Sequence, residues 1–127
     1  MLSPIPRRIL RDTLTLSVPG GFDRYQAPQE PTVYTVQNVH LQSNNETRKT
    51  TDNTEVVLRA ILFVDARYST PALDFWALQT AAQQAGGVMT CTVTDRRGGV
   101  TGPYTVLVVD GLPDDEDNLH HWELGLV

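Results

Sequence analysis

Carboxylates, imidazoles and a single thiol are the side chains of this sequence that could take part in chemistry. A calcium-binding EF-hand loop needs a glycine at its sixth position and a glutamate at its twelfth. Counted from Asp114, those positions hold Leu119 and Gly125, so the pattern fails. We therefore interpret the acidic run that starts at Asp114 as an exposed turn available to a binding partner. Its members are Asp114, Asp115, Glu116 and Asp117.

His120, His121 and Glu123 are the next candidates, because imidazole and carboxylate groups bind zinc. Neighbouring residues of a β-strand point to opposite faces. In the strand that we expect over residues 120–127, the two histidines therefore cannot hold one ion as neighbours. Cys91 has no basic residue nearby in sequence, which favours a buried thiol over a nucleophile. We predict no catalytic residue, no metal site and no cofactor.

A small metal-dependent enzyme that uses His120, His121 and the acidic run remains the alternative, and a metal assay on the purified protein would distinguish it. No GxSxG, Walker or GxGxxG motif supports a known catalytic or nucleotide site. The sequence by itself therefore indicates a binding or assembly module, and we predict that it is not an enzyme.

The composition is that of one globular domain. The chain has 127 residues, 40% hydrophobic and 20% charged, enough for a real core. No run approaches the roughly 18 apolar residues of a membrane span, so we expect no membrane partner. The first residues lack the apolar segment of a secretory signal. The single cysteine excludes an internal disulfide.

Charge is distributed unevenly along the chain, within a net charge of −5. Residues 1–50 carry six Lys or Arg against four acids, a balance of +2, and residues 51–127 carry four against eleven, a balance of −7. Such polarity can guide head-to-tail association. It argues against broad nucleic-acid binding, which usually needs a basic face. Ordinary surface charge that keeps the protein soluble is the alternative.

Residues 1–11 are predicted to form an extended arm, because Pro4 and Pro6 disfavour a helix. Arg7, Arg8 and Arg11 could meet acidic groups of a partner, or phosphates. A solvated tail is the alternative.

The elements that would position these side chains are organised around residues 55–65, the longest apolar stretch. Its β-branched and aromatic residues predict a central strand covered on both faces, with Leu58 and Leu62 on the same face. A short buried helix is the alternative. A strand of eleven residues is long for such a small domain, so we expect it to bend or to carry a bulge.

Five further strands and one helix are expected. In the second strand the alternation slips between Val36 and Val39, which predicts a bulge near Asn38. With no βαβ alternation, the elements predict a mainly β fold, a small six-stranded β-barrel with one packed helix. The further strands are residues 13–18, 32–42, 88–94, 104–110 and 120–127.

The helix is predicted over residues 71–85, because apolar residues recur at helical spacing and a glycine pair follows. Ser69 and Thr70 suggest its start, and Asp74 is an alternative cap one turn later. Phe75 and Trp76 are expected to plug an opening in the sheet. The alternative is an exposed aromatic side chain that binds a partner.

Residues 43–54 contain no large apolar residue and cannot bury themselves. We therefore expect an exposed, mobile loop of a dozen structureless residues, and loops of that length are often functional. A tolerated insertion without a function is the alternative.

Three segments of the chain resemble the minor capsid protein family of tailed phages. They are PIPRRIL near the N-terminus, ETRKTTDNTEVVLRAILFVDARYSTPALDF, which begins within the polar loop, and YTVLVVDGLPDDEDNLHHWELGLV at the C-terminus. Together they span nearly the whole chain. Members of this family look like small β-barrel head–tail connectors of the stopper, or head-completion, type.

The resemblance implies a structural protein of the virion neck, assembled in the bacterial cytoplasm. It implies a ring of about twelve copies between a portal-bound adaptor and a tail-side neck protein. In such stoppers an extended loop reaches into the channel and holds back packaged DNA without sequence preference. Another neck role, adaptor or tail completion, is the alternative. The family's loop maps here onto Asn45, Glu46, Thr47, Arg48, Lys49, Thr50, Thr51, Asp52 and Asn53.

Overall fold

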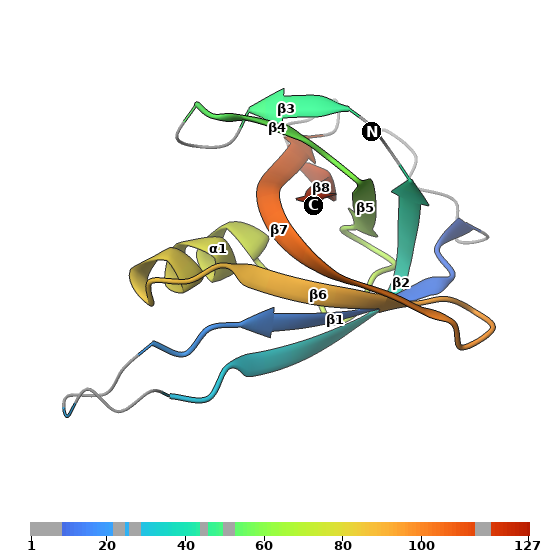
Figure 1. The fold of residues 1–127 in the computed structure, drawn as a ribbon. Coiled ribbons are helices and arrows are strands. Elements are labelled where there is room, and N and C mark those ends of the chain that lie inside the picture. The colour runs from blue at the N-terminus through green and yellow to red at the C-terminus, as the bar shows by residue number, and fades with distance from the viewer. Residues whose placement is uncertain (1–8, 22–24, 26–28, 44–45, 50–52, 114–117) are drawn as a thin grey trace.

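A computed structural model describes residues 9–21, 25, 29–43, 46–49, 53–113 and 118–127 of the chain. Six strands close into one antiparallel barrel in the order β1-β2-β5-β8-β7-β6 (Figure 1). This confirms the predicted six-stranded barrel with one helix. The barrel strands are β1 (Asp12–Val18), β2 (Thr32–Ser43), β5 (Ala60–Asp65), β6 (Met89–Thr94), β7 (Val100–Pro113) and β8 (Leu119–Leu126).

The predicted central strand is two strands with a bend between them. β4 (Glu55–Val57) belongs to a separate two-stranded sheet with β3 (Thr47–Lys49), and β5 continues into the barrel. At the bend, the Leu58 N–H donates to Glu46 O and the Arg59 N–H donates to Leu126 O. The predicted faces are therefore wrong for Leu58, which packs outside the barrel with Ile61, whereas Leu62 points inside.

The predicted bulge in β2 is present at Asn38. Thr13 of β1 pairs with Gln37 and Asp12 pairs with Val39, so that Asn38 is the extra residue. Asn38 takes a left-handed conformation with φ 62, which asparagine tolerates better than most residues. Its side-chain Nδ2 donates to Tyr68 O over 3.0 Å. The bulge therefore anchors the segment that leads from β5 to the helix.

Helix α1 (Phe75–Gln84) is shorter than predicted and begins at the alternative cap. Asp74 Oδ1 accepts a hydrogen bond from the Ala77 N–H over 3.2 Å. Ser69, which was predicted to cap the helix, accepts instead from the Asp65 N–H. Because the Ser69 hydroxyl binds the turn after β5, it does not cap the helix. The helix therefore starts at the later cap, Asp74.

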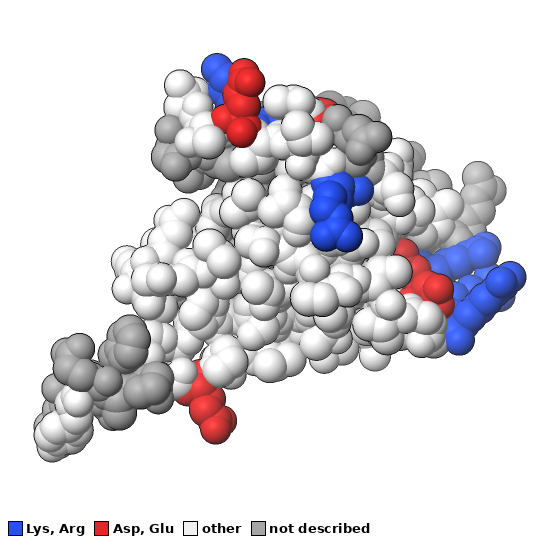
Figure 2. All heavy atoms as spheres, in the orientation of Figure 1, with Lys and Arg blue, Asp and Glu red and all other residues white. Residues whose placement is uncertain are grey.

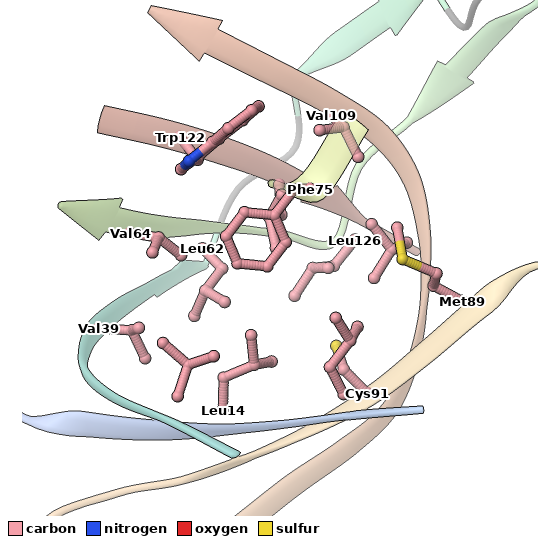
Figure 3. Packing of buried hydrophobic residues seen from close by; sticks show 14 of the residues in the cluster. Leu14, Val39, Leu62, Val64, Phe75, Met89, Cys91, Val109, Trp122 and Leu126 are labelled. Carbon is pink, nitrogen blue, oxygen red and sulfur yellow. The ribbon is translucent and has the colours of Figure 1, made fainter. Parts of the chain in front are cut away.

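Phe75 fills the barrel interior, as predicted. Its side chain is fully buried among Leu62, Val64 and Leu126, and its ring meets Trp122 edge-on at 5.4 Å (Figure 3). Trp76 does not enter the core and stays 52% exposed. The first turn of α1 therefore closes the barrel with one aromatic ring and presents the other outside.

Candidate functional site

The segment predicted as a structureless loop contains a β-hairpin. Its strand β3 pairs with β4, so that Thr47 lies opposite Val57, Arg48 opposite Val56 and Lys49 opposite Glu55. Residues 43–54 contain no large apolar residue. β3 nevertheless forms, because it pairs with β4, which contains Val56 and Val57. Four of the residues assigned to the channel loop, Asn45, Thr50, Thr51 and Asp52, lie outside the described residues.

The hairpin lies over the outer face of β7 and β8 (Figure 1) and rests there on an apolar cluster. Leu58, Ile61 and Val108 are its buried members, with Val56 partly buried beside them. Gly125 of β8 makes this packing possible, because a Cβ there would lie 3.0 Å from both methyl carbons of Leu58. The cluster therefore fixes the base of the hairpin to the barrel wall.

Arg48 makes the polar link between the hairpin and the barrel. Its Nη1 lies 2.7 Å from Asp110 Oδ2 on β7, and its Nη2 lies 2.8 Å from Glu123 Oε1 on β8. Its Nε lies 3.1 Å from Glu46 Oε1 within the hairpin. The guanidinium group therefore binds three carboxylates from three segments, and its side chain is only 21% exposed.

This arrangement fixes the charge of both partners. Burial would lower the pKa of Arg48, but the hydrogen bonds to Glu123 and Glu46 outweigh it and raise that pKa above its ordinary value. Burial would raise the pKa of Glu123, but the hydrogen bonds from Arg48 and His121 hold it below its ordinary value of 4.5. Arg48 and Glu123 therefore form a persistent ion pair at neutral pH.

Arg48 is consequently engaged by the protein itself. Arg48 and Lys49 both belong to the segment onto which the family resemblance maps the channel loop. Lys49 is exposed on the same hairpin, and Asn53, also exposed, takes a left-handed conformation with φ 67. Of the two cations, Lys49 is the one placed to meet an external anion.

Of the two carboxylates that receive Arg48, Asp110 was not among the predicted candidates and Glu123 was considered only as a zinc ligand. Asp110 and Glu123 lie directly opposite each other on neighbouring strands, and like charges in that position repel each other. The available signal was a single acid in each of the two strands. It indicates that a cation from elsewhere in the chain must lie between them.

The two histidines come together, contrary to the prediction that they face apart. His120 Nδ1 lies 2.8 Å from His121 Nδ1. On β7, Leu112 pairs with His121 and Pro113 pairs with Leu119, so that His120 is the extra residue of a bulge. A bulge interrupts the strict alternation of a strand, which explains why the rings meet.

A hydrogen-bond chain follows from this contact. His121 Nε2 lies 3.0 Å from Glu123 Oε2, and because an ionised carboxylate only accepts, His121 donates at Nε2. A neutral His121 then accepts at Nδ1, and His120 is the donor. Among the described residues no group of three or more His, Cys, Asp or Glu is arranged to hold a metal ion. The hydrogen bonds from His120 to His121 and from His121 to Glu123 therefore extend the Arg48 network along β8.

Cys91 is buried on β6, as expected, and burial raises the pKa of its thiol to about 12. The thiolate needed for a nucleophile is therefore scarce at neutral pH.

The residues predicted to bind partners are mostly outside the described part of the chain. This applies to Arg7 and Arg8 and to the whole acidic run at residues 114–117. Arg11 is exposed at one end of the barrel, where it shares a hollow with Asp12, Asp95, Arg96 and Arg97. Arg96 and Arg97, in the turn between β6 and β7, were not among the residues predicted to bind a partner.

A second, more apolar hollow of about 350 Å³ lies between α1, β4, the start of β6 and the middle of β7. Trp76, outside it, is held in place, since its Nε1 donates to Val109 O over 3.2 Å and its ring meets Trp122 at 4.7 Å. Gly111 provides the room, because a Cβ there would lie 2.8 Å from the Trp76 ring. Two predictions were made for Trp76, that it plugs an opening in the sheet or that it binds a partner. A side chain that packs on Trp122 and is half exposed is compatible with both.

Comparisons with known proteins add no assignment. No family model, no curated protein and no solved structure matches the chain. Within the part of the chain that the structure describes, no helix combines the length and apolarity that a membrane crossing requires.

Proposed function

We propose that the protein is a head–tail connector of the stopper type in the neck of a tailed phage. In this proposal about twelve copies form a ring between the portal-bound adaptor and the tail-side neck protein. The ring helps to retain packaged DNA. The protein assembles in the bacterial cytoplasm, acts in the virion and has no catalytic role or cofactor. The sequence resemblance supplies the family, and the six-stranded barrel has the architecture expected for it.

The hairpin held by Arg48 is the observation that carries the proposal. A gate needs a segment that projects from a stable body and keeps its direction under load. The β3–β4 hairpin is joined to the barrel wall by an apolar cluster and by three carboxylate contacts of one guanidinium. Its base is therefore fixed, while the segment between Lys49 and Asn53 is polar throughout and suited to a wet channel.

The test replaces residues 50–53 by Asn-Gly, which together with Thr54 leaves a three-residue connection suited to a tight hairpin and keeps Arg48 and both strands. Loop-closure entropy changes slowly with length, by about 0.6 kcal/mol per doubling, so the melting temperature should change little. We expect particles with this variant to package DNA and then to lose it or fail to join tails.

A matched control keeps the length and replaces residues 50–53 by serine, which separates the reach of the hairpin from its side-chain chemistry. Normal DNA retention in particles that contain the shortened hairpin would contradict the gating role. Imaging of the neck gives the position of the ring, and a ring bound directly to the portal or at the tail end would indicate the adaptor or tail-completion role instead.

A further inference from the structure

The turn between β6 and β7 is a rigid platform for two arginines. Asp95 Oδ1 accepts hydrogen bonds from the N–H groups of Arg97 and Gly99, each over 2.8 Å. The Asp95 N–H donates to Gly99 O over 2.8 Å, and Gly98 supplies the left-handed conformation with φ 86. Because the backbone of the turn is fixed by these bonds, Arg96 and Arg97 project from an ordered tip.

A third arginine reaches the same place through the barrel register. β1 pairs with β6 so that Thr13 lies opposite Thr94, which brings Arg11 next to the turn. Arg11, Arg96 and Arg97 line a hollow of about 530 Å³ together with Asp12 and Asp95. Figure 2 shows Lys and Arg side chains gathered at the end of the molecule where the β6–β7 turn lies.

The two carboxylates in this hollow are bound to the backbone. Asp95 Oδ1 accepts the two N–H bonds of its own turn, and Asp12 Oδ2 accepts from the Leu41 N–H over 2.9 Å. Within the described residues, neither Arg96 nor Arg97 takes part in an ion pair. Their guanidinium groups are exposed and available to an anion from outside.

The lining of the hollow indicates the kind of anion. A protein partner usually meets an interface with an apolar centre and a polar rim. Every described residue that lines this hollow is charged, so it offers no apolar centre. Phosphate groups of a nucleic-acid backbone are bound by arginines without any apolar contact.

We propose that Arg11, Arg96 and Arg97 form a contact for the backbone phosphates of duplex DNA. The identity of the phosphate polymer rests on the proposed neck function, in which packaged DNA passes through the ring. The contact is separate from the β3–β4 hairpin, where Arg48 is already neutralised by carboxylates. The contact recognises only the charge and the spacing of the phosphates. Binding is therefore independent of the DNA sequence and weakens as the salt concentration rises.

The salt dependence gives a quantity to measure. Each neutralised phosphate of duplex DNA contributes about −0.9 to the slope of log K against log salt concentration. Three arginine contacts therefore give a slope of about −2.7. Replacing two of them should reduce the slope by about 2.

The experiment follows amide and guanidinium resonances of the full-length protein by NMR during titration with two short duplexes of unrelated sequence, because this method detects weak binding. We expect both duplexes to shift the resonances of residues 95–99 and of Arg11 more than those of the rest of the barrel. The variant R96A/R97A should strongly weaken these shifts and reduce the salt dependence of binding by about 2 in slope. The control R59A/R67A removes the same charge at two other exposed arginines and should bind as the wild type does.

Two results would overturn the contact: no shift at these residues at low salt, or equal weakening by both double variants. Polyglutamate is titrated in parallel at equal charge, and stronger binding of polyglutamate at the same residues would assign the surface to an acidic protein instead. The neck function is tested separately by the presence of the protein in purified necks. If the protein is present in the neck but does not bind DNA, only this inference is refuted. If it binds DNA but is absent from the neck, only the proposed function is refuted.

Discussion

Arg48 resolves a conflict between two neighbouring strands. Asp110 and Glu123 lie opposite each other on β7 and β8, and without a cation they would repel each other. Arg48 reaches both from β3. The same side chain therefore relieves repulsion in the barrel wall and holds the hairpin, so its loss has two consequences.

Replacing Arg48 by methionine should lower the free energy of unfolding by about 1–3 kcal/mol, because charged hydrogen bonds are lost and Glu123 stays partly buried without its partner. Lys49→Met is the matched control on the neighbouring residue, and as an exposed change it should stay within about 0.5 kcal/mol. Urea unfolding measures both. Equal effects of the two substitutions would show that Arg48 is an ordinary surface residue.

The lowered pKa of Glu123 predicts that the protein loses stability in acid. The pKa of Glu123 is held below the ordinary value of 4.5 in the folded protein, so its ionised form is stabilised by folding. That contribution is present above pH 4.5 and decreases as the pH falls through the lowered folded pKa. The wild type should therefore lose more stability than Glu123→Gln between pH 5 and strongly acidic pH, as measured by melting temperature. Parallel curves for the two proteins would refute the assignment.

At the level of elements, the hairpin and the barrel have separate apolar supports. Leu62 is fully buried inside the barrel, and Leu58 is fully buried outside it beneath β4. The bend at residues 58–59 thus divides one apolar stretch between two clusters. A defect in one cluster should affect its own element first.

Leu62→Ala should cost about 2–5 kcal/mol of global stability, since it leaves a cavity in the barrel core. Leu58→Ala should release the hairpin preferentially. In hydrogen exchange, we expect the amides of β3 and β4 to lose protection while those of β1 and β6 keep it. Uniform loss of protection across the barrel in Leu58→Ala would show that the hairpin is an inseparable part of the core.

Alternating apolar residues were sufficient to predict strands such as β1 and β6, which bury one side at period two. β5 is buried on both faces, and its continuous apolar run predicted it. The slip between Val36 and Val39 likewise located the bulge at Asn38. The hairpin could not be found in this way. Residues 47–49 carry no apolar pattern of their own, and their pairing depends on the bend at Leu58, which the continuous run of apolar residues conceals.

The candidate site was only partly accessible from sequence for a related reason. Arg48 lies in the polar segment that the sequence suggested, but its contacts come from Asp110 and Glu123, which are 62 and 75 residues away. The contact of His120 with His121 depends on a bulge set by the register of β7. Long-range register of this kind is decided by the closed sheet and leaves little trace in local spacing.

For the whole molecule, closure of the barrel limits how copies can associate. All six barrel strands have partners on both sides, so ring formation by strand addition to the barrel edge is excluded. Contacts between copies must use side chains or the edges of the separate β3–β4 sheet. The basic first segment and the acidic remainder of the chain provide opposite charges for a heterologous contact, the kind that generates rings.

We therefore expect the isolated protein to be a monomer or weak oligomer that forms a ring only on its partner. A contact between exposed charges is screened by salt, since the screening length falls from about 10 Å at 0.1 M to about 3 Å at 1 M. Light scattering at both salt concentrations, with and without the adaptor ring, measures this. Assembly should require the adaptor and weaken with salt. A tight homodimer that persists at 1 M salt without the adaptor would mean that apolar contacts drive association and that the charge asymmetry has no part in it.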